Sequence, residues 1–279
     1  MTLSTFLLID SKLIEFYSSA SSLDEVTATL PDAFYTTFST LAAGTKVLGL
    51  KKHLQRLYAP AHQIKLKPSA DEKTLREKIY LLTRTMLPNE SRLRLLLIKE
   101  TGYVYIAIQP FQPLPDSIYK NGVQVITSQL TRHNPRIKGT DFIAQSQAQR
   151  KLINKKTFEV LLTKNGKVSE GMTSNFYIVT KPNKVLVTAQ RGILLGVTRR
   201  SVLKLAKQQG LQIEYRAPAL NEKFDEAFLT SSSRGVVPII SIDNKPVGNG
   251  KVGKHTKQLI LAYQNYVQAQ AENLVFDNG

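Results

Sequence analysis

A lysine and a glutamate stand out because their surroundings could support chemistry. Lys138 lies in the segment Ile-Lys-Gly-Thr and Glu170 in Val-Ser-Glu-Gly-Met, so each is next to a glycine and close to apolar residues. These surroundings favour partial burial of both side chains. A lysine that is buried, or near another cation, has a lowered pKa and can act as an amine nucleophile. We expect Lys138 and Glu170 to contact opposite ends of one bound cofactor.

Three further segments carry groups that suit a bound phosphate. Gly196-Val197-Thr198 begins a predicted helix, whose first N–H groups and threonine hydroxyl can bind an anion. Residues 230–233 supply consecutive hydroxyls at the end of an apolar strand, and Arg56 supplies a cation on a predicted helix. Taken singly, each segment also reads as a capped helix, a polar loop or a solvated arginine. Their combination with Lys138 and Glu170 is what indicates a site.

The composition is that of a globular enzyme and excludes several kinds of site. The chain has 279 residues, of which 42% are hydrophobic and 21% charged, enough for a sizeable core and two domains. The absence of cysteine excludes disulfides, thiolate metal sites and a thiol nucleophile. The four histidines form no HExxH motif, and we predict no metal site.

The net charge of +17 raises the question of a nucleic-acid partner. The lysines and arginines are spread along the sequence without an Arg-Gly tract, a basic tail or an aromatic-basic repeat. A basic surface that attracts small anions is the simpler explanation. The first residues lack a signal-peptide pattern, and no apolar stretch reaches the length of a membrane span. We predict a cytoplasmic protein without nucleic-acid or membrane partners.

Two other motifs are discounted because of their context. Gly248-Asn-Gly250-Lys-Val-Gly253 matches GxGxxG, but only 26 residues follow it, too few for the rest of a dinucleotide-binding unit. Asp225 and Glu226 are adjacent in a predicted strand and therefore point to opposite faces, which argues against a pair of carboxylates.

Hydrophobic periodicity predicts an α+β chain of two domains. Residues 1–112 form a small α/β sandwich-like domain, and three prolines within 109–115 favour an extended linker over 113–121. Residues 122–279 form the cofactor-binding domain, which many short strands make β-barrel-like, with added helices. Asn165-Gly166 predicts a tight hairpin turn. The predicted helices span 51–64, 69–86, 141–153, 198–209 with Thr198 as N-cap, and 254–271.

Taken in order, these segments resemble the class IV aminotransferase family, the fold-type IV pyridoxal-phosphate enzymes. That family includes branched-chain aminotransferases, D-amino-acid aminotransferases and 4-amino-4-deoxychorismate lyases. Nearly the whole chain takes part, and the ordered set is more specific than any one segment. The matching segments are the hairpin over 6–16, His53-Leu-Gln-Arg56-Leu, Ile137-Lys138-Gly-Thr, Val168-Ser-Glu170-Gly-Met-Thr-Ser174-Asn175-Phe, Gly192-Ile-Leu-Leu-Gly196-Val-Thr198-Arg199, Asp225-Glu-Ala-Phe-Leu-Thr-Ser-Ser232-Ser, Val237-Pro238 and Gly248-Asn-Gly250-Lys-Val-Gly253.

The resemblance implies roles for particular residues and a homodimeric assembly. Lys138 would form the Schiff base with pyridoxal 5′-phosphate and then move a proton between the substrate Cα and C4′ of the cofactor. Glu170 would pair with the protonated pyridine nitrogen, which keeps the ring an electron sink. The other implied contacts are Arg56, Val197, Thr198 and Ser232 to the phosphate, and Ser174 and Asn175 around the ring.

Two departures from the family pattern affect the expected site. Residues 32–37, Asp-Ala-Phe-Tyr-Thr-Thr, lack the glycines of the family's GDGxFET-like segment, which puts the substrate contacts of this region in doubt. Phe142 stands where many relatives have tyrosine, so a hydroxyl contact to the cofactor from that position is absent.

The reaction itself has two readings. Thr36-Thr37 resembles the lyase branch, in which a threonine lies near the lysine, but such threonines are also ordinary strand residues. We favour an aminotransferase that moves an amino group between an amino acid and a 2-oxo acid. The alternative is 4-amino-4-deoxychorismate lyase, which acts on aminodeoxychorismate and releases pyruvate. A basic nucleic-acid-binding protein on a degenerate enzyme fold is a remote third.

Overall fold

A computed structural model of the chain describes residues 3–180 and 184–274. The chain divides into two compact units, of which the first contains the residues up to Gln112, 137–144 and those from Gln270 on. The second contains residues 113–136 and 145–269. The predicted boundary at the proline-rich stretch divides the chain only once, whereas these two units are discontinuous in sequence. Two later segments return to the first unit by strand pairing.

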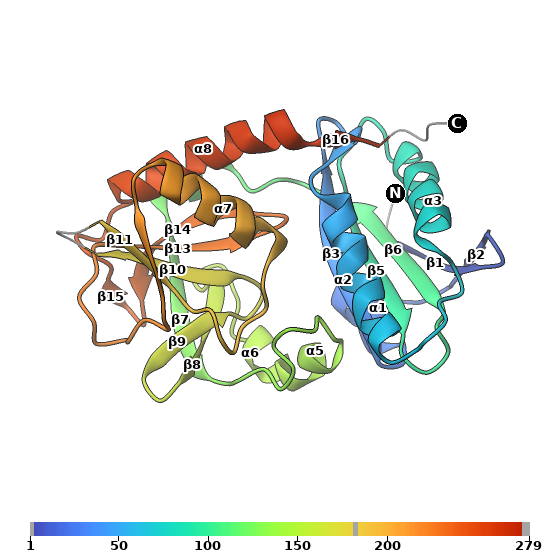
Figure 1. Cartoon of the computed structure of the whole chain (residues 1–279), viewed down its shortest axis with the longest axis horizontal. Coiled ribbons are helices and arrows are strands. Elements are labelled where there is room, and N and C mark those ends of the chain that lie inside the picture. The colour runs from blue at the N-terminus through green and yellow to red at the C-terminus, as the bar shows by residue number, and fades with distance from the viewer. Residues whose placement is uncertain (1–2, 181–183, 275–279) are drawn as a thin grey trace. The chain divides into compact units, whose positions relative to one another are not determined.

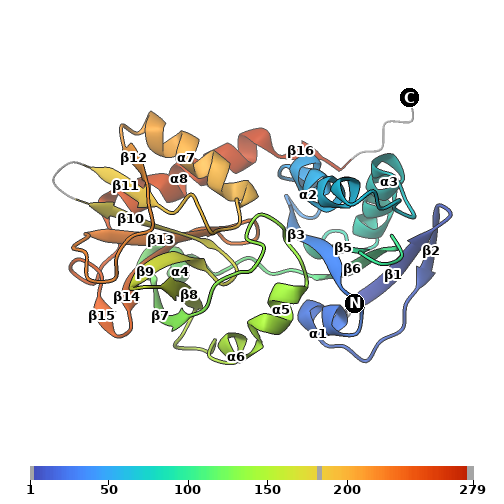
Figure 2. The same ribbon diagram turned by 60° about the horizontal axis from the view of Figure 1, so that its bottom comes forward.

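The first unit is an antiparallel sheet with the strand order β16-β4-β3-β5-β6-β1-β2. Helices α2 and α3 cover one face of this sheet, and α1 lies at the other face (Figures 1 and 2). The elements are β1 (Ser4–Ile9), β2 (Lys12–Glu15), α1 (Leu23–Ala28), β3 (Ala33–Leu41), β4 (Lys46–Val47), α2 (Leu50–Gln63), α3 (Glu72–Arg84), β5 (Ser91–Ile98), β6 (Val104–Pro110) and β16 (Glu272–Asn273).

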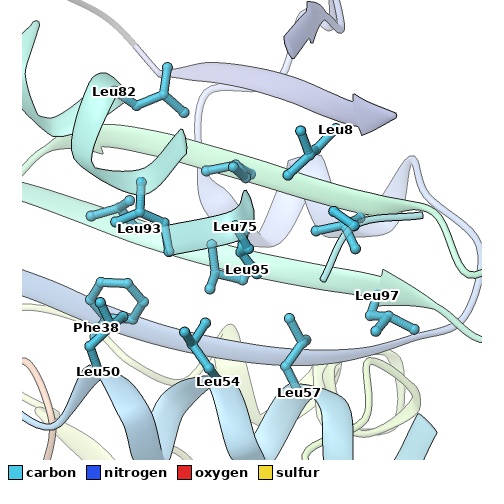
Figure 3. Packing of buried hydrophobic residues seen from close by; sticks show 14 of the residues in the cluster. Leu8, Phe38, Leu50, Leu54, Leu57, Leu75, Leu82, Leu93, Leu95 and Leu97 are labelled. Atoms are coloured by element: carbon cyan, nitrogen blue, oxygen red, sulfur yellow. The ribbon is translucent and has the colours of Figure 1, made fainter. Parts of the chain in front are cut away.

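The core of this unit lies between the sheet and helices α2 and α3. Leu50, Leu54 and Leu57, at helical spacing on α2, point toward Phe38 of β3 and the leucines of β5 (Figure 3). Each such side chain stabilises the fold by about 1.5–3 kcal/mol when fully buried. Because side chains alternate along a strand, Leu93, Leu95 and Leu97 of β5 face the helices, while Arg94 and Leu96 between them face the other way, toward Tyr35.

The second unit is a mixed sheet curled into a half-barrel, with the order β12-β11-β10-β13-β14-β7-β8-β9 and β15 paired to β14. Helices α7 and α8 lie along one side of it (Figure 1). The elements are α4 (Asp116–Asn121), β7 (Val123–Gln129), α6 (Gln147–Arg150), β8 (Glu159–Lys164), β9 (Lys167–Gly171), β10 (Asn175–Thr180), β11 (Val185–Thr188), α7 (Val197–Gln208), β12 (Gln212–Tyr215), β13 (Glu226–Ser231), β14 (Gly235–Ile242), β15 (Lys245–Pro246) and α8 (Lys254–Gln270). Helix α5 (Asp141–Gln145) spans the point where the chain passes from the first unit to the second.

The structure confirms most of the predicted elements and changes three. The turn at Asn165-Gly166 joins β8 to β9, and both residues have positive φ (51° and 70°). The single helix predicted over 141–153 is two short helices, α5 and α6, because Ser146 between them is not helical (φ −95°, ψ 12°). The predicted linker over 113–121 contains α4, which begins after Pro115 and ends at Gly122. The third change, at Thr198, concerns the site and is described below.

The net charge is concentrated in one unit. By sequence the second unit has 23 lysines and arginines against 8 aspartates and glutamates, a net +15, which leaves +2 for the first unit. Three of those eight carboxylates, on Glu159, Glu170 and Glu226, are buried. The surface of the second unit is therefore strongly basic. Within 3–180 and 184–274, no helix combines the length and the apolar composition needed to cross a bilayer.

Candidate functional site

Lys138 is positioned by strand pairing in the first unit. The main-chain N–H of Tyr35 donates to the Lys138 carbonyl (2.9 Å), and the N–H of Thr140 donates to the Ala33 carbonyl (2.9 Å), so residues 137–140 lie antiparallel to the start of β3. Because side chains alternate along an extended segment, those of Ile137 and Lys138 point to opposite faces of the sheet. Ile137 packs against the core, and the Lys138 Nζ lies 4.6 Å from the centroid of the Tyr35 ring. The expected lysine is thus held at a sheet edge by its own backbone.

Asp32 fixes this segment through hydrogen bonds. Its Oδ1 accepts from the Thr140 hydroxyl (2.8 Å) and the Ala33 N–H (3.1 Å), and its Oδ2 accepts from Lys99 Nζ (2.7 Å). Partial burial raises the pKa of Asp32, but the hydrogen bonds from Lys99 and Thr140 outweigh it and the pKa lies below its usual value. Asp32 therefore stays ionised at neutral pH. Asp32 belongs to residues 32–37, which lack the glycines of the family pattern. Its carboxylate nevertheless holds residues 137–140, which include Lys138, in place.

Tyr35 also contacts a second cation on its face of the sheet. The Arg94 guanidinium lies 5.1 Å from the Tyr35 ring centroid. Arg94 is buried, forms an ion pair with Asp24 of α1 (2.7 Å) and donates to the hydroxyls of Thr27 (2.8 Å) and Thr37 (3.1 Å). Several acceptors thus fix Arg94, and Thr37 is one of them.

The expected phosphate ligand Arg56 lies on α2, one turn after His53. His53 is 1% exposed, and its Nδ1 is hydrogen-bonded to the Thr36 hydroxyl at 2.7 Å. Burial, followed by the positive charges of Arg56, Lys138 and Lys52, holds the pKa of His53 well below its usual value, so the ring is neutral. Arg56 and Lys138, the two cations expected at the site, thus both lie close enough to His53 to affect its pKa.

Glu170 is the corresponding feature of the second unit. It lies near the end of β9 and is 2% exposed. Its Oε1 accepts a hydrogen bond from Arg132 Nε (3.1 Å) and its Oε2 accepts one from the Leu194 N–H (3.0 Å). A buried carboxylate requires such partners because desolvation of an ion is costly. The orientation of Glu170 is therefore fixed by one cation and one main-chain donor.

Asn175 holds the turn that leads into α7. Its Nδ2 donates to the Leu194 carbonyl (2.7 Å), and its Oδ1 accepts from the Gly196 N–H (3.2 Å). A side chain at position 196 would place its Cβ only 2.4 Å from that Oδ1, which explains the glycine. Leu194 donates to Glu170 and accepts from Asn175, so the same residue links the carboxylate to the start of the helix. Asn175 thus supports the helix start, and its expected place around a cofactor ring stays a prediction.

The start of α7 differs from the prediction that Thr198 is its N-cap. The N-cap is Gly196, which offers no side-chain acceptor, and the helix begins at Val197. Thr198 lies inside the first turn, and its hydroxyl accepts a hydrogen bond from the Tyr263 hydroxyl of α8 (3.4 Å). Burial raises the pKa of Tyr263 to about 12, so it remains a donor. The N-cap residue of α7 therefore contributes no side-chain hydrogen bond to the first turn, and the first N–H groups of a helix suit an anion.

Ser174 and Ser232 lie in two turns of the second unit. Ser174 follows β9, and its hydroxyl donates to Glu159 Oε2 (3.2 Å). Ser232 lies in the turn between β13 and β14, whose first residue, Ser231, accepts a hydrogen bond from Arg234 Nε (3.0 Å). Both expected serines are thus in turns that a charged residue holds.

Sequence reasoning assigned no role to four residues that organise these segments, namely Glu159, Arg132, Arg234 and His53. In the second unit, buried Glu159 pairs with Arg234 and buried Arg132 pairs with Glu170. In the first unit, buried His53 is hydrogen-bonded to Thr36. The signal for Glu159 is a lone carboxylate in the apolar run Phe-Glu-Val-Leu-Leu, where burial demands a partner. Phe142, the departure from tyrosine, is 1% exposed.

Comparison with known proteins places the chain among aminotransferases. The family profile described as "Amino-transferase class IV" matches residues 33–242. The D-alanine aminotransferase of Bacillus licheniformis is 30% identical over 246 residues, which is 81% of this chain and 85% of that protein. A probable branched-chain-amino-acid aminotransferase of Thermotoga maritima is 31% identical over 234 residues, covering 80% and 83% of the two chains. A T.th. branched-chain amino acid aminotransferase, solved with pyridoxamine 5′-phosphate, superposes with a TM-score of 0.80 at 19% identity over 98% of each chain.

Proposed function

We infer the function from one premise: the chain belongs to the class IV aminotransferase family and is therefore a pyridoxal-phosphate-dependent enzyme. We propose that it transfers an amino group between an amino acid and a 2-oxo acid, and that Lys138 forms the Schiff base with the cofactor. The observation that carries this proposal is the pairing of residues 137–140 with β3, which holds a lysine beside Tyr35.

Lys138 has the surroundings that an amine in this role requires. Its backbone is fixed by the Tyr35 N–H, so the amine pivots about a fixed point. When bound, the cofactor withdraws electrons from the substrate Cα. Lys138 would take the proton from that carbon and deliver it to C4′. Proton transfer of this kind requires a base within hydrogen-bonding reach, which a fixed backbone helps to ensure.

The donor set of the second unit suits the charged ends of the cofactor. We propose that the phosphate dianion binds at the N-terminus of α7, at Val197 and Thr198, and accepts from the hydroxyl of Ser232, which directly follows β13. Glu170, oriented by Arg132 and the Leu194 N–H, would hold the proton on the pyridine nitrogen. Ser174 and Asn175 would support the site around the cofactor ring. We propose these contacts for the second unit and a phosphate contact of Arg56 for the first.

The charge of the second unit supports an anionic ligand. A net +15 creates a positive potential that raises the local concentration of anions and speeds their association. Both the cofactor and carboxylate substrates are anions. We therefore attribute the basic composition to small-molecule ligands and propose no nucleic-acid or membrane partner.

The two threonines that resemble the lyase branch both have partners within the first unit. The Thr36 hydroxyl is bonded to buried His53, and the Thr37 hydroxyl is bonded to Arg94 on the opposite face. Both contacts are explained by the sheet of the first unit, so neither threonine supports a lyase. The relatives named above are also D-alanine or branched-chain aminotransferases.

A coupled assay tests the proposal. The full chain, saturated with cofactor, is supplied with D- or L-alanine or a branched-chain amino acid, with 2-oxoglutarate or pyruvate as acceptor. Aminodeoxychorismate is tested in parallel. We expect transfer from at least one donor. Release of pyruvate from aminodeoxychorismate, with no transfer from any donor, would overturn the proposal.

We further propose that the enzyme is cytoplasmic and forms a homodimer, as the family resemblance implies. Sedimentation of the cofactor-loaded protein tests the assembly. A species with twice the mass of the 31.2 kDa chain is expected, and a monomer at working concentration would contradict it.

A further inference from the structure

Glu159 is a buried carboxylate that the proposed chemistry does not use. It lies at the start of β8 with 0% of its surface exposed. Its Oε2 accepts hydrogen bonds from the Thr173 hydroxyl (2.6 Å), the Ser174 hydroxyl (3.2 Å) and Arg234 Nη2 (2.9 Å). Its Oε1 accepts one from the Val160 N–H (3.2 Å). Burial of an ion is tolerated only with such a complete set of partners.

Arg234 carries this network to a second turn. Its Nε donates to the Ser231 hydroxyl (3.0 Å), and its main-chain carbonyl accepts from the Tyr119 hydroxyl (2.9 Å). Its guanidinium also lies 5.2 Å from the centroid of the Phe158 ring. The arginine is thus fixed at both its backbone and its side chain. It closes the turn over 231–234, in which Ser232 lies.

The other end of the network is packed just as closely. A Cβ at Gly171 would lie 2.2 Å from the Ser174 hydroxyl oxygen and 3.2 Å from Glu159 Cγ. The turn over 171–174 directly follows Glu170 and is pressed against Glu159. Any movement of the Glu159 carboxylate therefore reaches the residues beside Glu170.

We propose that Glu159 and Arg234 are positioning residues that fix the turn over 171–174 relative to the turn over 231–234. The inference rests on the proposed function, because that function assigns Glu170 to the cofactor ring and Ser232 to its phosphate. The two turns come from different hairpins, and the ion pair that joins them links residues 75 positions apart in the sequence. Placement errors near 1 Å are enough to weaken such a site.

Glu159→Gln tests the network without a change of volume. Oε1 and Oε2 of Glu159 both act only as acceptors, whereas an amide offers one acceptor and one donor group. Whichever way the amide turns, its NH₂ faces a donor, either the Val160 N–H or the Arg234 and Thr173 donors. The variant must therefore shift one of its partners.

The measurement is the affinity of the full chain, stripped of cofactor, for pyridoxal 5′-phosphate and for pyridoxal, which lacks the phosphate. We expect Glu159→Gln and Arg234→Met to weaken binding of the phosphate form about tenfold or more, equivalent to about 1.4 kcal/mol. Pyridoxal affinity should change less, because the turn over 231–234 is assigned to the phosphate. Arg234→Lys keeps the charge and should recover part of the loss.

Glu222→Gln is the matched control. Glu222 pairs with Arg216 and accepts from the Ala219 N–H (3.0 Å), so it forms a similar ion pair in the same unit that joins neither turn. We expect it to bind both ligands as the wild type does. The melting temperature of each stripped variant is recorded alongside.

Three results would overturn the inference. Wild-type phosphate affinity in Glu159→Gln, even with a lowered melting temperature, would show that the pair only stabilises the fold. Equal losses for pyridoxal and its phosphate would remove the link to the phosphate turn, and an equal loss in Glu222→Gln would make the effect nonspecific. If the wild type itself failed to bind pyridoxal 5′-phosphate, the proposed function would fail instead.

Discussion

Replacing Gly196 by alanine should damage the turn that leads into α7. Gly196 has φ −61° and ψ 148°, a conformation that alanine adopts without strain, so any effect comes from the added methyl group. That methyl would lie 2.4 Å from Asn175 Oδ1, whereas ordinary contact begins at 3.4 Å. Asn175 or the turn must therefore move by about 1 Å.

A movement of this size breaks both hydrogen bonds between Asn175 and the turn. They are the 2.7 Å bond to the Leu194 carbonyl and the 3.2 Å bond from the Gly196 N–H. Each contributes about 0.5–1.5 kcal/mol net, so the expected loss is about 1–3 kcal/mol. If the turn binds the cofactor phosphate, affinity should fall by about tenfold or more.

The assay is a titration of the stripped protein with pyridoxal 5′-phosphate in a double-mutant cycle. Asn175→Ala removes the side chain that the methyl group meets, so Gly196→Ala should add little in that background. The expected result is strong non-additivity, with the double variant close to Asn175→Ala alone. Wild-type affinity in Gly196→Ala, or losses that simply add, would refute the reasoning.

Three other expectations concern protonation, salt and a buried ion pair. Because the pKa of His53 is lowered, its contribution to stability is complete above pH ~6.5 and is lost as the pH falls below that value, by up to about 1.4 kcal/mol per pH unit. The melting temperature of His53→Gln should therefore depend less on pH between ~6.5 and ~5 than that of the control His62→Gln, in which an exposed histidine is replaced. Equal pH dependence in the two variants would contradict this. Because the second unit carries a net +15, stopped-flow association of pyridoxal 5′-phosphate should slow with added salt far more than that of pyridoxal, and equal salt dependence would argue against steering. Arg132→Met removes the cation bonded to buried Glu170 and should lower the free energy of unfolding by about 3–5 kcal/mol, as measured by denaturant titration. Adding Glu170→Gln should recover most of this loss. A double variant less stable than either single variant would exclude the coupling.

The sequence was sufficient for the parts of the fold and site that depend on local pattern. The leucines of α2 predict their helix by spacing alone, and Asn165-Gly166 predicts its hairpin by turn chemistry. Lys138 and Glu170 were singled out by the glycines and apolar residues beside them, and their roles at the site stay predictions. These signals lie within a few residues of the feature they predict.

The contacts that organise the site are long-range and leave little local signal. Pairing of residues 137–140 with β3 joins positions more than a hundred residues apart, as the 107-residue separation of Ala33 and Thr140 shows. Thr198 was predicted as an N-cap from its local preference, but Asn175 and Tyr263 decide where the helix begins and what the hydroxyl bonds. In both cases tertiary partners override local preference.

Covalent trapping of the cofactor tests the central assignment most directly. The protein loaded with pyridoxal 5′-phosphate is reduced with borohydride, digested and analysed by mass spectrometry, with Lys138→Ala and, as a control in the same unit, Lys99→Ala treated alike. We predict that one reduced phosphopyridoxyl group is found on the peptide containing Lys138, in the wild type and in Lys99→Ala but not in Lys138→Ala. A label on another lysine, or full labelling of Lys138→Ala, would contradict the assignment of Lys138.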